Sequence, residues 1–254
     1  MIRFATTLAR KLTPDAVRPH RYFAALARSR TGQRVIAGPF KDMRYIDRSV
    51  GSAYVPKLLG IYERELASVV EQIVASRPSL IVDVGAAEGY YAVGLACRLP
   101  DTRMIAFEME AGGRAAVAEL AAANNVADRV TILATCEPEG LGAALDGQKG
   151  AVVIMDVEGY EDVLLDPAKV PALASTTFLV ELHEFAVAGI ADTIAKRFAP
   201  THDLELIWAE GRSRADFPWR TMVTRLLPAR YIDGAVSEMR PPRMSWFFAR
   251  LKAG

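Results

Sequence analysis

The sequence has little cysteine and histidine, with two of the first and three of the second among its 254 residues. Cys97 and Cys136 have no metal-binding spacing and form no disulfide framework. This scarcity excludes a disulfide-stabilised scaffold and favours a reducing, cytoplasmic compartment. We expect Cys97, which lies in a helical pattern, to be a small buried hydrophobic side chain.

Long apolar runs are missing as well. No run approaches the roughly 20 residues of a membrane-spanning helix, so we expect no span. The net charge is +1, and bulk charge therefore predicts no nucleic-acid partner. What remains is a chain with 51% apolar residues, enough for a large core, and a length that fits one α/β domain with additions.

Positive charge gathers in residues 1–34, where eight basic side chains accompany one acid, Asp15. The segment lacks the unbroken apolar core of a signal peptide. Its apolar residues could form short amphipathic helices: Phe4, Leu8, Leu12, Tyr22, Phe23 and Leu26. Two interpretations stay open, a solvated helix packed on the domain or a peripheral contact with an anionic membrane surface.

The most informative stretch runs from Leu80 to Glu108. An apolar run leads into the turn Asp83-Val84-Gly85-Ala86-Ala87-Glu88-Gly89, a helical pattern follows, and a second apolar run ends at Glu108. Such runs are typical of strands buried on both faces of a parallel sheet. Small residues in the turn let a ligand approach the backbone, and an acid after the second strand can accept both ribose hydroxyls. We therefore expect a nucleotide-type ligand here.

Two such ligands compete for the turn. The dinucleotide pattern Gly-x-Gly-x-x-Gly fails at its second and third positions, which hold Ala87 and Tyr90. The pattern acid-x-Gly-x-small-x-Gly fits, and it resembles the first motif of class I methyltransferases, which bind S-adenosylmethionine. The resemblance implies that the turn packs on the methionine part of this cofactor and that Glu108 holds the ribose. The cofactor-binding candidates in this stretch are Asp83, Gly85, Ala87, Glu88, Gly89 and Glu108.

Strand and helix patterns alternate along the rest of the chain, which predicts a parallel, doubly wound α/β sheet. Seven strand candidates are present: 80–82, 104–107, 130–133, 151–155, 176–183, 204–208 and 246–249. Class I methyltransferases have seven strands with the last one antiparallel, so the resemblance implies a Rossmann-like, mostly parallel seven-stranded sheet. We expect residues 1–60 to form a basic N-terminal helical and loop extension, and residues 61–254 to form the methyltransferase domain.

Three connecting regions carry further expectations. Residues 36–60 are rich in turn residues and predict an ordered loop or short hairpin. Helices are predicted from near Tyr62 to before Pro78 and from about Ala186 to Phe198. Residues 209–243 form a long connection with seven arginines, which either hold an anionic acceptor or make local ion pairs in a solvated loop.

Candidate catalytic residues follow two neighbouring strands. Asp156 ends one of them, and Glu181 and His183 lie two apart near the end of the next, on one face. His183 could act as a general base on a substrate hydroxyl. Alternatively, Asp156, Glu181 and His183 could hold a divalent ion such as Mg²⁺. A purely structural hydrogen-bonding role stays open, and we favour the base, with Glu181 orienting the imidazole.

The motif Asp156-Val157-Glu158-Gly159-Tyr160-Glu161, followed by Glu181-Leu182-His183, resembles the FkbM group of methyltransferases. The likeness extends from about Gly38 to Phe248. It implies transfer of a methyl group to oxygen, often on sugars or polyketide-derived hydroxyls, so the expected partner is a small-molecule or glycan acceptor. Tyr160 stands where many members have a small residue, which makes Glu158 and Tyr160 substrate candidates.

Tyr62 and Glu63, ahead of the first motif, either close over the cofactor or begin a helix whose dipole favours the acid. The interpretation that unites these patterns is an S-adenosylmethionine-dependent O-methyltransferase. Two rivals are a noncatalytic module that binds the same cofactor and a nicotinamide-dependent oxidoreductase. The sequence leaves the acceptor and the oligomeric state undetermined.

Overall fold

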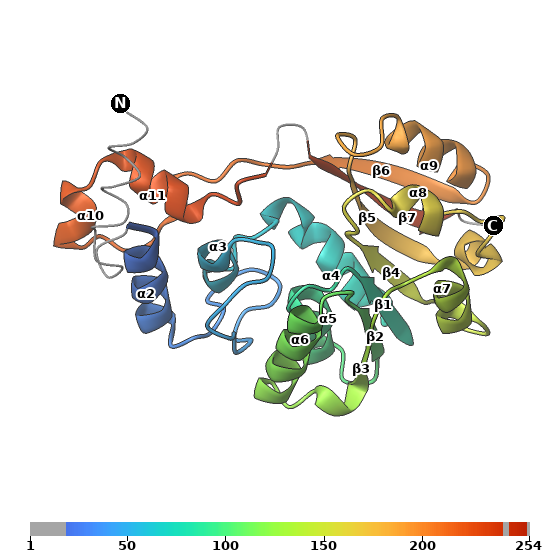
Figure 1. Cartoon of the computed structure of the whole chain (residues 1–254), viewed down its shortest axis with the longest axis horizontal. Coiled ribbons are helices and arrows are strands. Elements are labelled where there is room, and N and C mark those ends of the chain that lie inside the picture. Colours follow the sequence, from blue (N-terminus) through green and yellow to red (C-terminus); the bar gives the residue numbers. More distant parts are fainter. Residues whose placement is uncertain (1–18, 241–243, 253–254) are drawn as a thin grey trace.

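The computed structural model describes residues 19–240 and 244–252. Within these ranges a seven-stranded sheet has the order β3-β2-β1-β4-β5-β7-β6 (Figure 1). The strands are β1 (Leu80–Val84), β2 (Arg103–Phe107), β3 (Val130–Leu133), β4 (Val152–Met155), β5 (Thr177–Leu182), β6 (His202–Trp208) and β7 (Ser245–Leu251). The first five strands pair in parallel, and β7 runs antiparallel to both of its neighbours. The predicted mostly parallel sheet with an antiparallel last strand is confirmed.

Helices cover both faces of the sheet. One face packs against α4 (Ala67–Ser76), α5 (Tyr90–Arg98) and α6 (Ala111–Ala123), and the other against α7 (Pro138–Leu145), α8 (Glu161–Leu164) and α9 (Ile190–Phe198). Every residue of β1 and β4 is buried. These two central strands are therefore apolar almost throughout, and the carboxylate of Asp83 in β1 is the exception.

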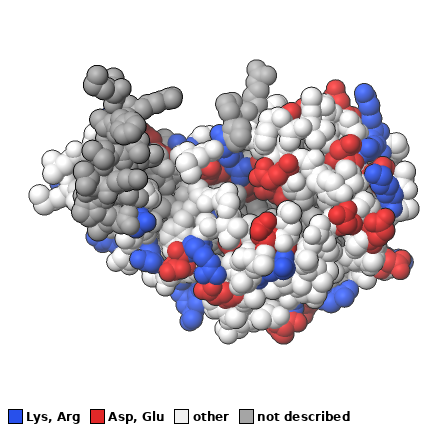
Figure 2. Space-filling view, in the orientation of Figure 1, with Lys and Arg blue, Asp and Glu red and all other residues white. Residues whose placement is uncertain are grey.

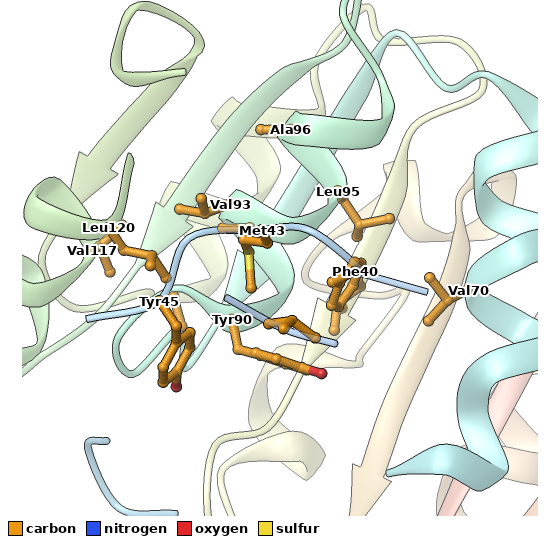
Figure 3. Close-up of a cluster of buried hydrophobic side chains, with 14 of the residues drawn as sticks. Phe40, Met43, Tyr45, Val70, Tyr90, Val93, Leu95, Ala96, Val117 and Leu120 are labelled. Atoms are coloured by element: carbon orange, nitrogen blue, oxygen red, sulfur yellow. The ribbon is translucent and has the colours of Figure 1, made fainter. Parts of the chain in front are cut away.

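A loop segment before the first strand packs over α5 and α6. Figure 3 shows Phe40, Met43 and Tyr45 of this segment facing Tyr90 and Val93 of α5. An isolated bridge joins Arg34 to Arg44, and a short helix, α3 (Tyr54–Leu59), follows. The sequence predicted the ordered loop but not this helix. Gly60 has no room for a side chain, since a Cβ there would collide with the carbonyl oxygen of Ala37.

The first described helix and residues 214–236 come together in a group of short helices, which we call the helical cap. It consists of α2 (Pro19–Thr31), the 3₁₀ turn η5 (Arg214–Asp216), α10 (Met222–Leu226) and α11 (Ala229–Val236), and it lies at one end of the molecule (Figure 1). The hydroxyls of Tyr22 and Thr221 are 3.0 Å apart, and the rings of Phe23 and Phe217 meet edge to face at 5.2 Å. The expectation that 209–243 is only a loop is thus wrong, because much of it folds onto α2.

Two helices begin later than the sequence predicted. The first opens with a 3₁₀ turn, η2 (Arg64–Leu66), because the preceding Glu63 has a left-handed backbone with φ of 47°. The second starts at Ile190, after Gly189 at φ 77°. There the carboxylate of Glu184 accepts hydrogen bonds from the N–H groups of Gly189 and Ala191. A third difference is Cys97, which is exposed rather than buried.

Parts of two sequence predictions lie outside the described residues: the apolar positions Phe4, Leu8 and Leu12, and Arg243 with its neighbouring prolines. In α2, Phe23 is fully buried against the cap, so this part of the basic segment packs on the protein. Among residues 19–240 and 244–252, no helix has both the length and the apolar character to cross a membrane.

Candidate active site

A cavity of about 360 Å³ opens at the carboxyl edge of β1, β4 and β5, where an α/β sheet places its ligands. Its walls come from the segment from Val50 to Leu66, the turn after β1 with the start of α5, the ends of β4 and β5, and residues 238–240 with Met244 and Trp246. Of the sequence-predicted residues, the lining includes Tyr62, Glu63, Asp83, Ala87, Asp156, Glu158, Glu181 and His183. The structure therefore brings the predicted cofactor turn and the predicted catalytic residues to one cavity.

The turn after β1 is shaped by close backbone contacts. Gly85 has φ of 84°, and a Cβ there would collide with the carbonyl oxygen of Asp156, so only glycine fits. Gly89 begins α5 in the left-handed conformation. The carboxylate of Asp83 accepts a hydrogen bond from the N–H of Ala92 at 3.0 Å. Burial raises the pKa of Asp83 to about 7, with the charges of Asp156 and Glu108 adding to the effect.

Glu108 ties the turn to the second strand. One carboxylate oxygen accepts from the N–H of Ala87 at 2.7 Å, and the other accepts from the N–H of Glu110 at 2.8 Å. Gly113 leaves space for this side chain, since a Cβ there would collide with it. Each carboxylate oxygen has a further lone pair, so the predicted ribose contact is compatible with these bonds.

Glu88, a cofactor-binding candidate from the sequence, is not among the residues that line the cavity. Its carboxylate is fully buried and forms an ion pair with Lys57. It also accepts from the hydroxyl of Tyr45 and from the N–H of Val50, the latter at 2.9 Å. Burial would raise the pKa of Glu88, but Lys57 outweighs it and the pKa is lowered. Glu88 therefore fixes the loop segment onto α5.

Arg240 lies in the cavity wall and binds three carboxylates. Its guanidinium donates to the carboxylates of Glu63, Glu181 and, at 3.0 Å, Glu238. It lies 4.9 Å from the ring centre of Trp246, which is paired with Glu181 across β5 and β7. Arg212 is likewise buried, between Glu65 and Glu238. The arginines of residues 209–243 were expected either to hold an anionic acceptor or to make local ion pairs. Arg212 and Arg240 make local ion pairs.

His183 follows β5 and is almost fully buried. Its Nδ1 lies 2.5 Å from a carboxylate oxygen of Glu161, and its Nε2 lies 3.5 Å from both Asp156 and Glu158. Burial lowers the pKa of His183, but the hydrogen bond and charge of Glu161, with the charges of Asp156 and Glu158, raise it above its usual value. The imidazole thus turns Nε2 toward two carboxylates at the cavity.

Glu161, rather than Glu181, orients the imidazole, which corrects the sequence-based assignment. The side chain of Glu161 is fully buried, and the same oxygen accepts from the N–H of Gly159 at 3.1 Å. Glu181 instead pairs with Arg240 and with Asp156. Burial and the neighbouring carboxylates raise the pKa of both Asp156 and Glu181. One proton shared between these two acids relieves their repulsion.

The ligand atoms suited to a cation also differ from those predicted. Asp156, Glu158 and His183 offer atoms that all lie within 4.8 Å of one another, whereas Glu181 is outside this group. Two carboxylates and an imidazole suit Mn²⁺ better than Mg²⁺, which prefers oxygen alone. Tyr160 does not line the cavity: it is exposed, and its hydroxyl donates to Glu137 at 2.8 Å.

Sequence reasoning missed three of these residues: Lys57, Glu161 and Arg240. Glu161 lies in the motif that begins at Asp156, but the sequence does not show that its carboxylate contacts His183. The other two act through residues that are distant in sequence, such as Glu63, which lies 177 positions from Arg240. Only the folded chain brings these groups together.

No protein-family model matches the sequence, and no curated protein matches it either. Two solved structures share its fold. One is a protein from Klebsiella pneumoniae assigned as an O-methyltransferase, with a TM-score of 0.51, 11% identity and coverage of 98% of this chain and 96% of that one. The other is the O-methyltransferase TomG of tomaymycin synthesis from Streptomyces achromogenes, in complex with S-adenosylmethionine, with a TM-score of 0.51, 14% identity and coverage of 91% and 95%. The chain therefore has the Rossmann-like fold of class I methyltransferases.

Proposed function

We propose that the protein is an S-adenosylmethionine-dependent O-methyltransferase that acts on a hydroxyl of a small molecule or glycan. The observation that carries the proposal is the place of His183, whose Nε2 faces the cavity while Glu161 holds Nδ1. A buried, oriented imidazole beside the turn predicted to bind the cofactor is suited to take the proton of a hydroxyl acceptor. The likeness of the motifs to the FkbM group supports oxygen as the methyl acceptor.

In this proposal the turn of Asp83, Gly85, Ala87 and Gly89 would hold the cofactor, and Glu108 would bind its ribose. Lys57 and Tyr62 line the same cavity and would contact the methionine part. The cofactor supplies an electrophilic methyl group on a positively charged sulfur. Tyr62 and Glu63, held by Arg240, would form the wall that excludes water from this group.

The acceptor hydroxyl would approach Nε2 of His183 from the cavity. Nε2 would take the proton of this hydroxyl as its oxygen receives the methyl group that the cofactor would supply. Asp156 and Glu158, each 3.5 Å from Nε2, stabilise the imidazolium that results. Glu161 keeps the ring in the tautomer whose Nε2 is free to accept a proton.

Metal-assisted transfer is the second candidate, and the close approach of Asp156, Glu158 and His183 favours it. These three residues would hold a divalent ion that lowers the pKa of the acceptor hydroxyl. Glu181 would not be a ligand here. We favour the base because Glu161 already fixes the imidazole through Nδ1.

The remaining sequence expectations stay proposals. These are a cytoplasmic location, the division at residue 60, the absence of a nucleic-acid partner, and Glu158 as an acceptor contact. For Tyr160 we propose no direct contact, because its hydroxyl is engaged with Glu137 outside the cavity.

A binding and turnover experiment tests the proposal. S-adenosylmethionine and its demethylated product should each raise the melting temperature, whereas NAD should not, because only a ligand that binds the native state stabilises it. Turnover with a panel of hydroxyl acceptors should release the demethylated product. Tight binding of NAD alone would identify an oxidoreductase, and cofactor binding without turnover on any acceptor would favour the noncatalytic module.

A further inference from the structure

Helix α10 turns its apolar side chains outward. Met222 is 79% exposed and Leu226 is 82% exposed, and they lie one helical turn apart on one face. Val223 beside them is 43% exposed, whereas the polar Thr224 is buried. A solvated surface helix has the opposite arrangement, so the pattern indicates that this face has a partner.

Hydrogen bonds hold α10 in this orientation. The hydroxyl of Thr221 accepts from the N–H of Thr224 at 3.1 Å, and the hydroxyl of Thr224 accepts from the N–H of Thr221 at 2.8 Å. Tyr22 bonds to the same Thr221 hydroxyl and ties α10 to α2. The polar residues therefore face the cap, and the apolar ones are presented to the outside.

Met222, Val223 and Leu226 form an apolar tip, and the chain segment that carries it is basic. The acids that flank this segment are engaged elsewhere, Asp216 with Arg64 and Asp233 with the N–H of Arg214. Residues 217–232 contain Arg220, Arg225 and Arg230 and no acid, and residues 19–40 contain four arginines and no acid. Arg220, Arg225 and Arg230 are all exposed, and within the described part of the chain no acid forms an ion pair with them. At the end of the molecule where Figure 1 places α10, Figure 2 shows white side chains with blue ones below them.

We infer that α10 and its arginines dock the protein on an anionic lipid surface. Apolar side chains surrounded by positive charge match the boundary between acyl chains and anionic headgroups. A nucleic acid would engage the arginines but leave Met222 and Leu226 in water. A second copy of the chain would bring two positive surfaces together, which their repulsion opposes.

The docking surface is joined directly to the cavity. Helix α11 ends at Val236, and Glu238, Met239 and Arg240 after it form part of the cavity wall. A membrane contact at α10 would therefore be linked to this wall through α11. The inference is independent of the proposed methyl transfer, since lipid binding is measured without turnover.

Co-sedimentation of the full chain with vesicles tests this inference. Binding to vesicles of phosphatidylcholine with phosphatidylglycerol should exceed binding to phosphatidylcholine alone, and should fall at ~1 M salt, where the screening length is only about 3 Å. The double variant Met222→Glu/Leu226→Glu should abolish binding. Arg220→Ala/Arg225→Ala should weaken it about 25-fold, since one basic residue near an anionic surface contributes about fivefold.

Matched controls separate the tip from general effects of charge. Leu206→Glu, at a partly exposed apolar position of β6, and Arg77→Ala/Lys149→Ala, at exposed basic positions, should bind like the parent protein. Melting temperatures report whether each variant is folded. Absence of vesicle binding, or binding that the tip variants leave unchanged, would overturn the inference. RNA binding or a dimer that the tip variants dissolve, without vesicle binding, would assign the surface to that partner instead.

Discussion

The Nδ1 atom of His183 lies 2.5 Å from the carboxylate of Glu161, a side chain with no exposed surface. The two residues come from the loop after β5 and from the start of α8, and they are 22 positions apart in the chain. This contact leaves Nε2 facing the cavity. Much of the expected behaviour of the site follows from it.

Glu161→Gln should lower kcat by about 10²–10⁴, because a glutamine that donates to Nδ1 would force the tautomer in which Nε2 carries the proton. The pH profile gives a second readout. Glu161 raises the pKa of His183, so its loss should move the acidic limb of the rate profile to lower pH. Glu137→Gln removes a similar charge from the exposed partner of Tyr160 and should leave the profile in place. An unshifted limb in Glu161→Gln would contradict this role.

His183→Ala, combined with chelation, separates base from metal. As a base, His183 should account for about 10²–10⁴ in rate, and EDTA should leave the parent protein active. If an ion acts instead, EDTA should abolish turnover, Mn²⁺ or Mg²⁺ should restore it, and Glu158→Gln should weaken metal affinity. Activity that is lost with EDTA and regained with the ion would decide against the base.

Glu108→Ala should weaken cofactor binding tenfold to hundredfold, since hydrogen bonds to a charged group contribute about 1.5–3 kcal/mol. Calorimetry with the demethylated cofactor measures this directly. Glu110→Ala, an exposed neighbour at the start of α6, is the matched control and should bind normally. Equal affinity in Glu108→Ala and the parent would show that Glu108 only supports the turn.

Lys57→Met should lower the free energy of unfolding by about 3–5 kcal/mol, because it leaves the buried carboxylate of Glu88 without its cation. The double variant Lys57→Met/Glu88→Leu should regain part of the loss. Urea denaturation measures both. The exposed pair of Arg48 and Glu119 is the contrast, and Arg48→Met should cost less than about 1 kcal/mol.

Asp83 should make stability depend on pH. Its pKa is about 7 in the folded protein, above the usual value of about 3.9 in an unfolded chain. Its contribution to stability is therefore fully present below about pH 4 and is lost as pH rises toward 7, by up to about 4 kcal/mol. Asp83→Asn should flatten the stability curve over this range. Urea denaturation from pH 5 to 8 measures the stability of both proteins. Identical stability curves for parent and variant would contradict the raised pKa of Asp83.

Local patterns predicted the sheet and the turn well. The residues of β1 before Asp83 and the residues of β4 up to Met155 are continuous apolar runs. Such runs have few alternatives to a buried parallel strand. The glycines of the turn follow from backbone geometry that a short sequence already encodes. These features depend on neighbours in the chain, so the sequence alone predicts them.

The helical cap and the orientation of His183 depend on distant contacts. Helix α10 has five residues and α11 has eight, and both are too short to be stable without α2 beside them. The sequence predicted that Glu181, two residues from His183, orients the imidazole, whereas the structure assigns this contact to Glu161. The guanidinium of Arg240 binds the carboxylate of Glu181 instead. Arg240 belongs to a segment whose position in the fold cannot be predicted from its neighbours in the sequence.

The bond between Tyr22 and Thr221 joins residues 199 positions apart. Residues 209–240 leave the ribosome long after α2, so α2 must wait for its partner until that segment has been made. During that interval the first five strands can assemble while the cavity still lacks the wall that contains Arg240. The nascent chain would therefore expose an acidic, open site, and the segment that carries Arg240 would close it.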